Sequence, residues 1–240
     1  MSKSDVRYGE VIGHIKDKKL VKYANDTKKL LSVTIETKQG DRIDTVVFGT
    51  KKQPQKPAEI DGEIRVGDYV LAKGSLSERE SKSKDGQRTY RNYSLSVSYY
   101  KHLDEENNQS GTSFTLSGVI QKRKGNNLTI LSKDRYKNAQ GEEVTYENEL
   151  VVTFDEERTQ CVDFDDLVPK TKVSIVGAIL NRVESTVVST DEHRLEAMGD
   201  AGKKRSGGKV RVELLAATIK SLGEEEDESL DELDEEYIPF

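Results

Sequence analysis

Short apolar segments alternate with polar ones along most of the chain, and the apolar segments are rich in Val, Ile, Thr and Tyr. This composition is typical of β-strands. Apolar and polar residues also partly alternate within the segments: Leu95, Val97 and Tyr99, for instance, are separated by serines. Because successive side chains of a strand point to opposite faces, we expect these three residues to share one face.

The strand-like segments form two sets of five that occur in the same order. The first set covers residues 8–15, 30–36, 43–48, 69–76 and 93–103, and the second covers residues 114–120, 128–131, 149–154, 173–179 and 212–222. Gly13 and Gly118 hold equivalent places, which gives a repeat of roughly 105 residues. A repeat of this length has the size of a domain, so the pattern indicates a tandem duplication.

A glycine interrupts the fourth strand of each set, at Gly74 and Gly177. Glycine within a strand usually marks a bulge or a sharp bend. Five short, bent strands in about 100 residues suit a small barrel, and the oligonucleotide/oligosaccharide-binding (OB) barrel has this number of strands. We therefore predict an all-β fold of two tandem five-stranded OB-fold barrels followed by a disordered acidic C-terminal tail.

Composition divides the chain into four predicted segments: a first barrel at residues 1–103, a polar linker at 104–111, a second barrel at 112–222 and the tail at 223–240. Between strands three and four of the second copy, residues 155–167 give the best helix pattern in the chain. The matching residues 51–57 of the first copy contain Pro54 and Pro57, which favour an irregular loop.

Charge is distributed unevenly along the chain, whose net charge is −6. Residues 1–103 hold 21 basic and 14 acidic residues, residues 107–222 hold 17 of each, and residues 223–240 hold 10 acidic and no basic residues. A basic first part favours a polyanionic partner, and a segment as acidic as the tail cannot bury a core.

Residue types for catalysis or metal binding are sparse. The three histidines and the single cysteine, Cys161, have no metal-site spacing, and no glycine-rich loop has the context of a phosphate-binding motif. We therefore expect no enzymatic activity, no metal and no cofactor. The single cysteine, the lack of an apolar run of about 18 residues and the polar N-terminal segment favour a cytoplasmic protein without a membrane partner.

Basic and aromatic residues are interleaved in the first copy. Single-stranded nucleic acids are held by cations that follow the phosphates and by rings on which bases stack. Because a small barrel also needs aromatic residues in its core, each tyrosine is a candidate for stacking or for packing. The candidate residues for binding single-stranded DNA are Lys28, Lys29, Arg42, Phe48, Lys51, Lys52, Tyr69, Lys73, Lys82, Lys84, Arg88, Tyr90, Arg91 and Tyr93.

Four motifs resemble the bacterial and phage-type single-stranded DNA-binding protein family. Residues 46–51, Val-Val-Phe-Gly-Thr-Lys, are similar to its Val-Val-x-Trp-Gly-Lys stretch, and residues 66–76 are similar to its fourth strand, Lys-Gly-x-x-Val-x-Val-x-Gly-x-Leu. Residues 85–90, Asp-Gly-Gln-Arg-Thr-Tyr, resemble its Asp-Gly-x-x-x-Tyr hairpin tip. Residues 235–240, Glu-Glu-Tyr-Ile-Pro-Phe, resemble its Asp-Asp-Asp-Ile-Pro-Phe terminus.

The resemblance implies specific roles. Phe48 would stack on a base, Tyr90 would be a second platform, and Lys51, Lys73 and Arg88 would contact phosphates. The chain departs from the family in having no tryptophan. Most family members have one barrel per chain and assemble as tetramers, so two barrels imply either a homodimer with four barrels or a monomer that wraps less DNA. Such divergence would suit a phage or plasmid protein.

The acidic tail ends in an apolar triplet. Repulsion between its carboxylates keeps such a chain extended, and we expect it to compete with DNA for the basic groove. A pocket with apolar walls and a basic rim would recognise its end. The residues assigned to partner binding are Asp234, Glu235, Glu236, Tyr237, Ile238, Pro239 and Phe240.

These patterns predict a non-catalytic protein that coats and protects single-stranded DNA during replication, recombination and repair and recruits partner proteins through its tail. Two alternatives stay open: a tandem OB-fold RNA-binding protein, and a protein–protein adaptor that binds no nucleic acid. Titration with DNA and RNA of equal length separates the first, because a site can exploit the 2′-hydroxyl. Absence of oligo-dT binding at low salt would favour the second.

Overall fold

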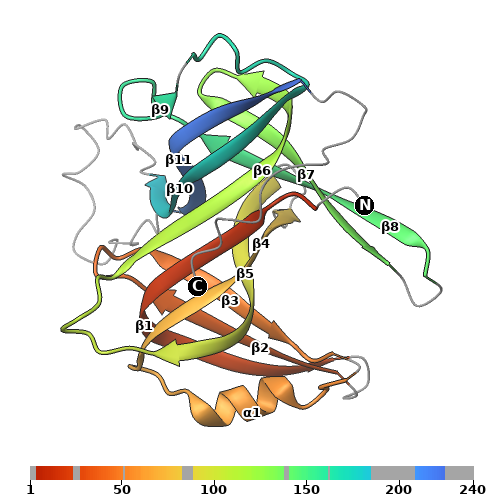
Figure 1. Ribbon diagram of the computed structural model, residues 1–240. Helices are drawn as coiled ribbons and strands as arrows, with labels where there is room; N and C mark the ends of the chain where they lie inside the picture. The colour runs from red at the N-terminus through yellow and green to blue at the C-terminus, as the bar shows by residue number, and fades with distance from the viewer. Residues whose placement is uncertain are drawn as a thin grey trace, which may run out of the picture.

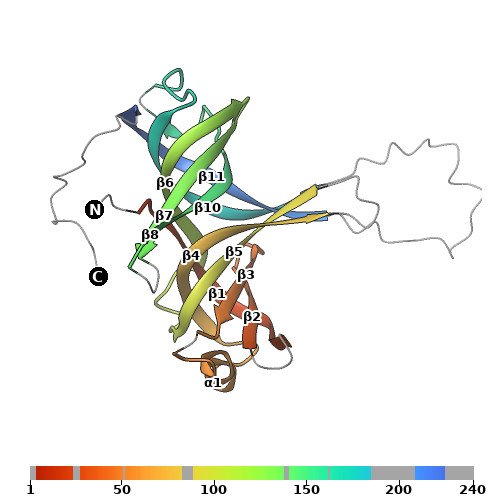
Figure 2. The same cartoon turned by 90° about the vertical axis from the view of Figure 1, so that its right-hand side faces the viewer.

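The computed structural model describes residues 4–23, 28–50, 52–82, 89–137, 141–161, 163–184 and 209–224. Within these ranges the chain forms eleven β-strands and one short helix. Figures 1 and 2 show two barrels, the first below the second in the view of Figure 1. The prediction of an all-β fold is confirmed.

The strands of the first barrel form a closed ring. They are β1 (Arg7–Tyr23), β2 (Lys28–Glu36), β3 (Arg42–Phe48), β4 (Tyr69–Lys82) and β5 (Thr89–His102). Around the ring the order is β1-β2-β3-β5-β4, and β4 pairs again with β1. Only the β3–β5 pair of this ring is parallel. All five strands predicted for the first copy are present.

The second barrel repeats this order. It contains β6 (Gly111–Lys124), β7 (Asn127–Lys137), β8 (Glu143–Thr153), β10 (Thr171–Glu184) and β11 (Lys209–Glu224), with the short β9 (Gln160–Cys161) beside β11. The ring runs β6-β7-β8-β11-β10, and β10 pairs again with β6. The β8–β11 pair is parallel, as is the equivalent pair in the first barrel. The predicted duplication is therefore present in the topology.

One antiparallel pair of strands joins the barrels. β1 pairs with β6 from Arg7 opposite Leu116 to Ile12 opposite Gly111, so a single sheet runs through both barrels. The β4–β5 and β10–β11 hairpins extend on the same side of the molecule (Figure 2). The relative positions of the two barrels are thus fixed by backbone hydrogen bonds.

The polar segment between β5 and β6 is held against the first barrel. The Glu105 carboxylate lies 3.2 Å from the His14 ring nitrogen Nε2 and forms a 3.2 Å ion pair with Lys38. The hydrogen bond from Lys38, together with the nearby His14, lowers the pKa of Glu105. The hydroxyl of Ser110 donates to the carbonyl of Ile12 at 2.8 Å and accepts the Lys38 N–H at 2.8 Å. This segment therefore adds side-chain contacts to the junction between the barrels.

The predicted bulges lie at the two mid-strand glycines. The β4–β5 register shifts between Ala72 and Gly74, and the β10–β11 register shifts between Val176 and Gly177. A Cβ at Gly74 would lie 2.1 Å from the carbonyl oxygen of Ser96. Only glycine permits so close an approach of the neighbouring strand. These glycines therefore allow each barrel to curl.

The bulge in the first barrel changes the alternation of β5. Leu95 and Val97 both point into the core, but Tyr99 is 55% exposed, so the prediction that all three share one face was wrong for Tyr99. After the bulge Tyr100 points inward instead, and its hydroxyl lies 2.6 Å from the Thr45 hydroxyl. Burial raises the pKa of Tyr100 far above its usual range. A single extra residue thus reverses which tyrosine enters the core.

The helix prediction was wrong in both copies. Helix α1 (Lys56–Glu63) lies in the first copy, where Pro57 occupies the first turn and no backbone N–H bond is needed. Lys18 donates to the carbonyls of Asp61 at 2.5 Å and Ile64 at 2.8 Å, which places a cation at the C-terminal end of the helix. In the second copy the described residues 155–161 and 163–167 contain turns and β9 instead.

Candidate nucleic-acid interface

An exposed aromatic ring marks the end of β3 in the first barrel. Phe48 lies opposite Leu30 of β2 and is 44% exposed. The N–H of the next residue, Gly49, donates to the Lys29 carbonyl at 3.2 Å, and Lys52 is exposed in the turn that follows. The Lys29 ammonium donates to the side chain of Gln55 at the start of α1. Phe48, Lys29 and Lys52 therefore lie at the same end of the barrel.

Two other predicted cations lie elsewhere and are ion-paired. Arg42 is at the opposite end of β3, where its Nε lies 2.6 Å from a carboxylate oxygen of Glu36. Hydrogen bonds from Lys16 and Arg42 lower the pKa of Glu36. Lys73 is on β4, 2.6 Å from Glu10, and this hydrogen bond raises the pKa of Lys73. The structure does not bring Arg42 and Lys73 together with Phe48.

Two predicted stacking residues are buried. The Tyr69 hydroxyl donates to the Asn108 carbonyl at 3.0 Å, and the ring contacts His14 with centroids 4.9 Å apart. The Tyr93 hydroxyl donates to the Val151 carbonyl at 2.9 Å and accepts the Val151 N–H at 3.2 Å, which connects β5 to β8 of the second barrel. Tyr69 is 7% exposed and Tyr93 is 4% exposed. We therefore do not retain Tyr69 and Tyr93 as stacking candidates.

The remaining predicted residues stay predictions. Lys28, Lys82, Tyr90 and Arg91 lie in strands whose backbone is described, but their side chains fall outside the description. Other predicted residues lie outside the described ranges entirely, namely Lys51, Lys84, Arg88, Asp234, Glu235, Glu236, Tyr237, Ile238, Pro239 and Phe240.

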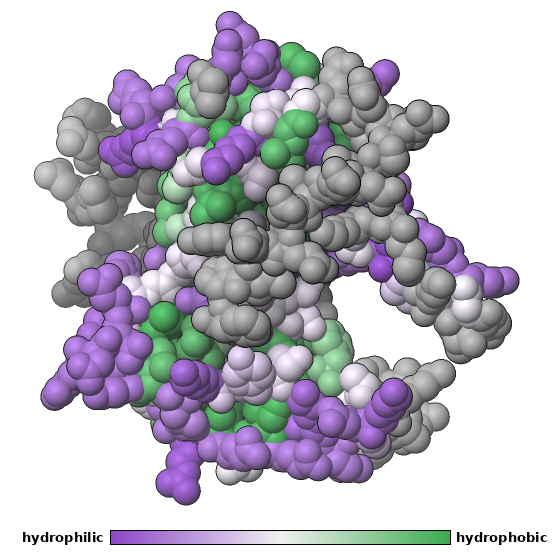
Figure 3. All heavy atoms as spheres, viewed as in Figure 1, coloured by the Kyte–Doolittle hydropathy of each residue, from purple (hydrophilic) through white to green (hydrophobic). Residues whose placement is uncertain are grey.

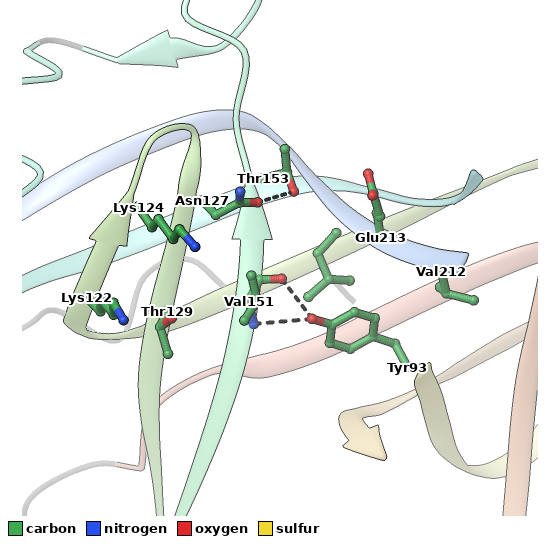
Figure 4. Close-up of a pocket in the computed structure, with 10 residues that line it drawn as sticks. Tyr93, Lys122, Lys124, Asn127, Thr129, Val151, Thr153, Val212 and Glu213 are labelled. Atoms are coloured by element: carbon green, nitrogen blue, oxygen red, sulfur yellow. Dashed lines mark hydrogen bonds between the residues drawn. The ribbon is translucent and has the colours of Figure 1, made fainter. Parts of the chain in front are cut away.

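A groove of about 400 Å³ opens on the second barrel beside the junction (Figure 4). Lys122 and Lys124 of β6 border it, across from Thr129 and Asn127 of β7. Both lysines are exposed, and neither forms an ion pair with another residue that the structure describes. Tyr93 of the first barrel contributes to the wall of the groove. The second barrel thus has a groove with two available cations.

A pair of exposed tyrosines lies on the neighbouring strands β7 and β8. The rings of Tyr136 on β7 and Tyr146 on β8 have centroids 5.6 Å apart and are inclined by only 14°. Their exposed fractions are 47% and 57%. A hydrogen bond from Tyr146 raises the pKa of Tyr136.

Comparisons with known proteins are informative for the fold. No protein-family model and no curated protein sequence matches the chain. Solved structures do match, and two of them are of the single-stranded DNA binding protein from Thermus aquaticus. The wild-type structure has 8% sequence identity and a TM-score of 0.54, with 94% of this chain and 97% of that chain covered. A deletion mutant has 9% identity and a TM-score of 0.54, with 95% and 99% covered.

This chain and the Thermus aquaticus protein share a fold. This likeness covers nearly the full length of both chains, and it agrees with the OB-fold barrels predicted from the strand pattern. Among the residues described, no group of three or more His, Cys, Asp and Glu side chains is placed to hold a metal ion. The one helix in the described ranges is too short and too polar to cross a membrane.

Sequence reasoning did not single out the groove lysines or the tyrosine pair of the second copy, because the net charge of that copy is balanced. A local signal was present: the run Lys122, Arg123 and Lys124 directly precedes a glycine turn. Tyr136 and Tyr146 flank the next turn at positions that a hairpin brings together. Net charge averaged over a domain therefore hides cations that the strands place on one side.

Proposed function

We propose that the protein binds single-stranded DNA without sequence preference and has no enzymatic activity. The observation that carries this proposal is Phe48, a large ring held exposed at the end of β3 with Lys29 and Lys52 nearby. Rings for bases and cations for phosphates are the two elements of such binding. The motif resemblance around Phe48, the groove bordered by Lys122 and Lys124, and the fold likeness support it.

Replacing Phe48 with alanine is expected to weaken oligo-dT binding by about 5- to 150-fold, the effect of losing one base-stacking contact. Fluorescence anisotropy with labelled oligo-dT measures this affinity. Phe48→Tyr retains a ring and should bind almost as the unmodified protein does. Tyr99→Ala removes a ring that is at least as exposed but lies on β5 and should have no effect. An unchanged affinity for Phe48→Ala would contradict the assigned role.

We further propose that the protein coats single-stranded DNA in replication, recombination and repair, in the bacterial or host cytoplasm. Two barrels per chain support a homodimer that presents four barrels, as an alternative to a monomer that wraps less DNA. Mass photometry of the free protein and of complexes with an oligo-dT length series distinguishes these assemblies. Parallel titration with RNA of equal length tests the RNA-binding alternative.

Removing residues 231–240 is expected to leave oligo-dT affinity equal or higher, because the acidic segment no longer competes for the cations that bind phosphate. The same truncation should abolish the recruitment of partner proteins, since it removes the apolar triplet together with half of the tail's acidic residues. Anisotropy at low salt measures the first effect, and co-purification with the full and truncated chains measures the second. Weaker DNA binding after truncation would contradict competition by the tail.

A further inference from the structure

The β7–β8 hairpin extends beyond the second barrel. β6 pairs with β7 only as far as Leu131, whereas β7 and β8 stay paired out to Lys137 opposite Glu143. Figures 1 and 3 show the hairpin standing away from the body of the molecule, with open space between it and the first barrel. An isolated two-stranded hairpin is only marginally stable in water, so its orientation needs support from elsewhere.

Tyr136 and Tyr146 lie on the extended part of this hairpin. Asp134 is opposite Tyr146 and Tyr136 is opposite Val144, so the two rings are diagonal neighbours on one face. Each ring is about half exposed, and the two are nearly parallel. A flat aromatic partner can cover the outer face of such a pair, and every nucleobase has a flat aromatic face.

Arg7 connects this hairpin to the first barrel. Its side chain is only 10% exposed, and its guanidinium donates to the Leu76 carbonyl of β4 at 2.6 Å and to the carboxylate of Asp134. Asn148 of β8 also donates to Asp134, at 3.4 Å. Asp134 precedes Tyr136 by two residues and lies opposite Tyr146. The half-buried Arg7 therefore holds the hairpin at the position of the tyrosine pair.

The residues before Arg7 cover the edge of β7 that β6 leaves open. The Asp5 N–H donates to the Lys133 carbonyl at 2.9 Å, and its carboxylate accepts the Lys133 N–H at 2.8 Å. The Ser4 hydroxyl donates to the Arg135 carbonyl at 3.1 Å and accepts the Arg135 N–H at 2.8 Å. An exposed strand edge is thereby satisfied over the two residues that flank Asp134.

We propose that Tyr136 and Tyr146 form a base-stacking site for single-stranded DNA, and that Arg7 is its positioning residue, acting through Asp134. The site rests on the proposed function and adds to it a contact outside the barrel grooves. Residues 4–7 lead into the first barrel and form hydrogen bonds with β7, so they fix the direction in which the hairpin extends. The tyrosine pair is therefore held at a fixed place relative to Phe48. One strand of DNA then contacts rings in both copies.

The test measures oligo-dT affinity of full-length variants by anisotropy. The double variant Tyr136→Ala/Tyr146→Ala is expected to bind about 5- to 150-fold more weakly, and Tyr136→Phe/Tyr146→Phe, which keeps both rings, should bind as the unmodified protein does. With bromodeoxyuridine-substituted DNA, irradiation should cross-link the peptides that contain Tyr136 and Tyr146. Unchanged affinity of the alanine variant, together with no cross-link to these peptides, would overturn the stacking site.

The positioning role is tested by Asp134→Asn, which removes the charge that Arg7 meets but keeps the size of the side chain. It should weaken binding and lower the cross-link yield at both tyrosines. In the Tyr136→Ala/Tyr146→Ala background it should add no further loss, because it acts through those rings. Additive losses would overturn the positioning role. If Asp134→Asn does not fold, Arg7→Lys is tested in its place. It keeps the charge at this position, so it should retain part of the positioning and weaken oligo-dT binding to a smaller extent.

These outcomes are distinguishable from failure of the proposed function. If the unmodified protein does not bind oligo-dT at low salt, the proposed function is wrong. If it binds and Phe48→Ala weakens binding while the tyrosine variants and their cross-links show no effect, only the inference about the hairpin is wrong.

Discussion

Gly177→Ala is expected to lower the thermal unfolding midpoint by about 2–12 °C, which corresponds to an overpacking cost of about 1–3 kcal/mol in a protein of this size. A Cβ at Gly177 would lie 2.0 Å from the carbonyl oxygen of Leu215 and 2.7 Å from the ring of Phe114. Phe114 is a buried core residue, and Leu215 is held in the β10–β11 pair. Neither neighbour can retreat without opening the second barrel.

Gly111→Ala is the matched control. Gly111 is also a strand residue, at the start of β6, but a Cβ there meets nothing within 4 Å and its backbone needs no positive φ. Alanine at such a position is expected to be neutral or slightly stabilising, because it restricts the unfolded chain. Circular dichroism of both variants on heating measures the difference. Equal midpoints would mean that the bulge has room for a side chain and would contradict its role in closing the barrel.

The barrel strands could be predicted because their signal is local. An inward-facing position favours an apolar residue, and a glycine is needed where β4 and β10 bend. The residues of each strand therefore indicate which of its positions face the core and where it bends. The duplication reinforced this signal, since each copy gave an independent instance of the same order.

The other features depend on contacts between distant residues. Pro57 was interpreted as breaking a helix, yet it begins α1, whose C-terminal end is held by Lys18 from β1. Tyr93 could stack or pack on sequence grounds, and its hydrogen bonds to Val151 in the other barrel decided the outcome. The tyrosine pair required the β7–β8 register. Such contacts exist only after the strands have paired, so the residues next to each of these positions do not determine them.

Oligo-dT affinity is expected to fall by about 10²- to 10⁴-fold between 50 and 200 mM salt, if about six to ten phosphates are neutralised. Each cation that binds a phosphate releases counterions from DNA, which gives a slope of about −0.7 per contact for single strands in a plot of log affinity against log salt. Lys122 and Lys124 have no ion pair to break within the described chain, so both are available for phosphates.

Lys122→Gln/Lys124→Gln should therefore reduce the steepness of this slope by about 1.4, the sum of two contacts. Lys73→Gln is the matched comparison, because Lys73 already meets Glu10 at 2.6 Å and should leave the slope almost unchanged. If Lys73→Gln instead reduced the steepness by the amount expected for one phosphate contact, Lys73 would have to exchange its ion pair with Glu10 for a phosphate when DNA binds. The family resemblance implies such a phosphate contact. A flat salt dependence of the unmodified protein would contradict phosphate binding itself, and the adaptor alternative would then be favoured.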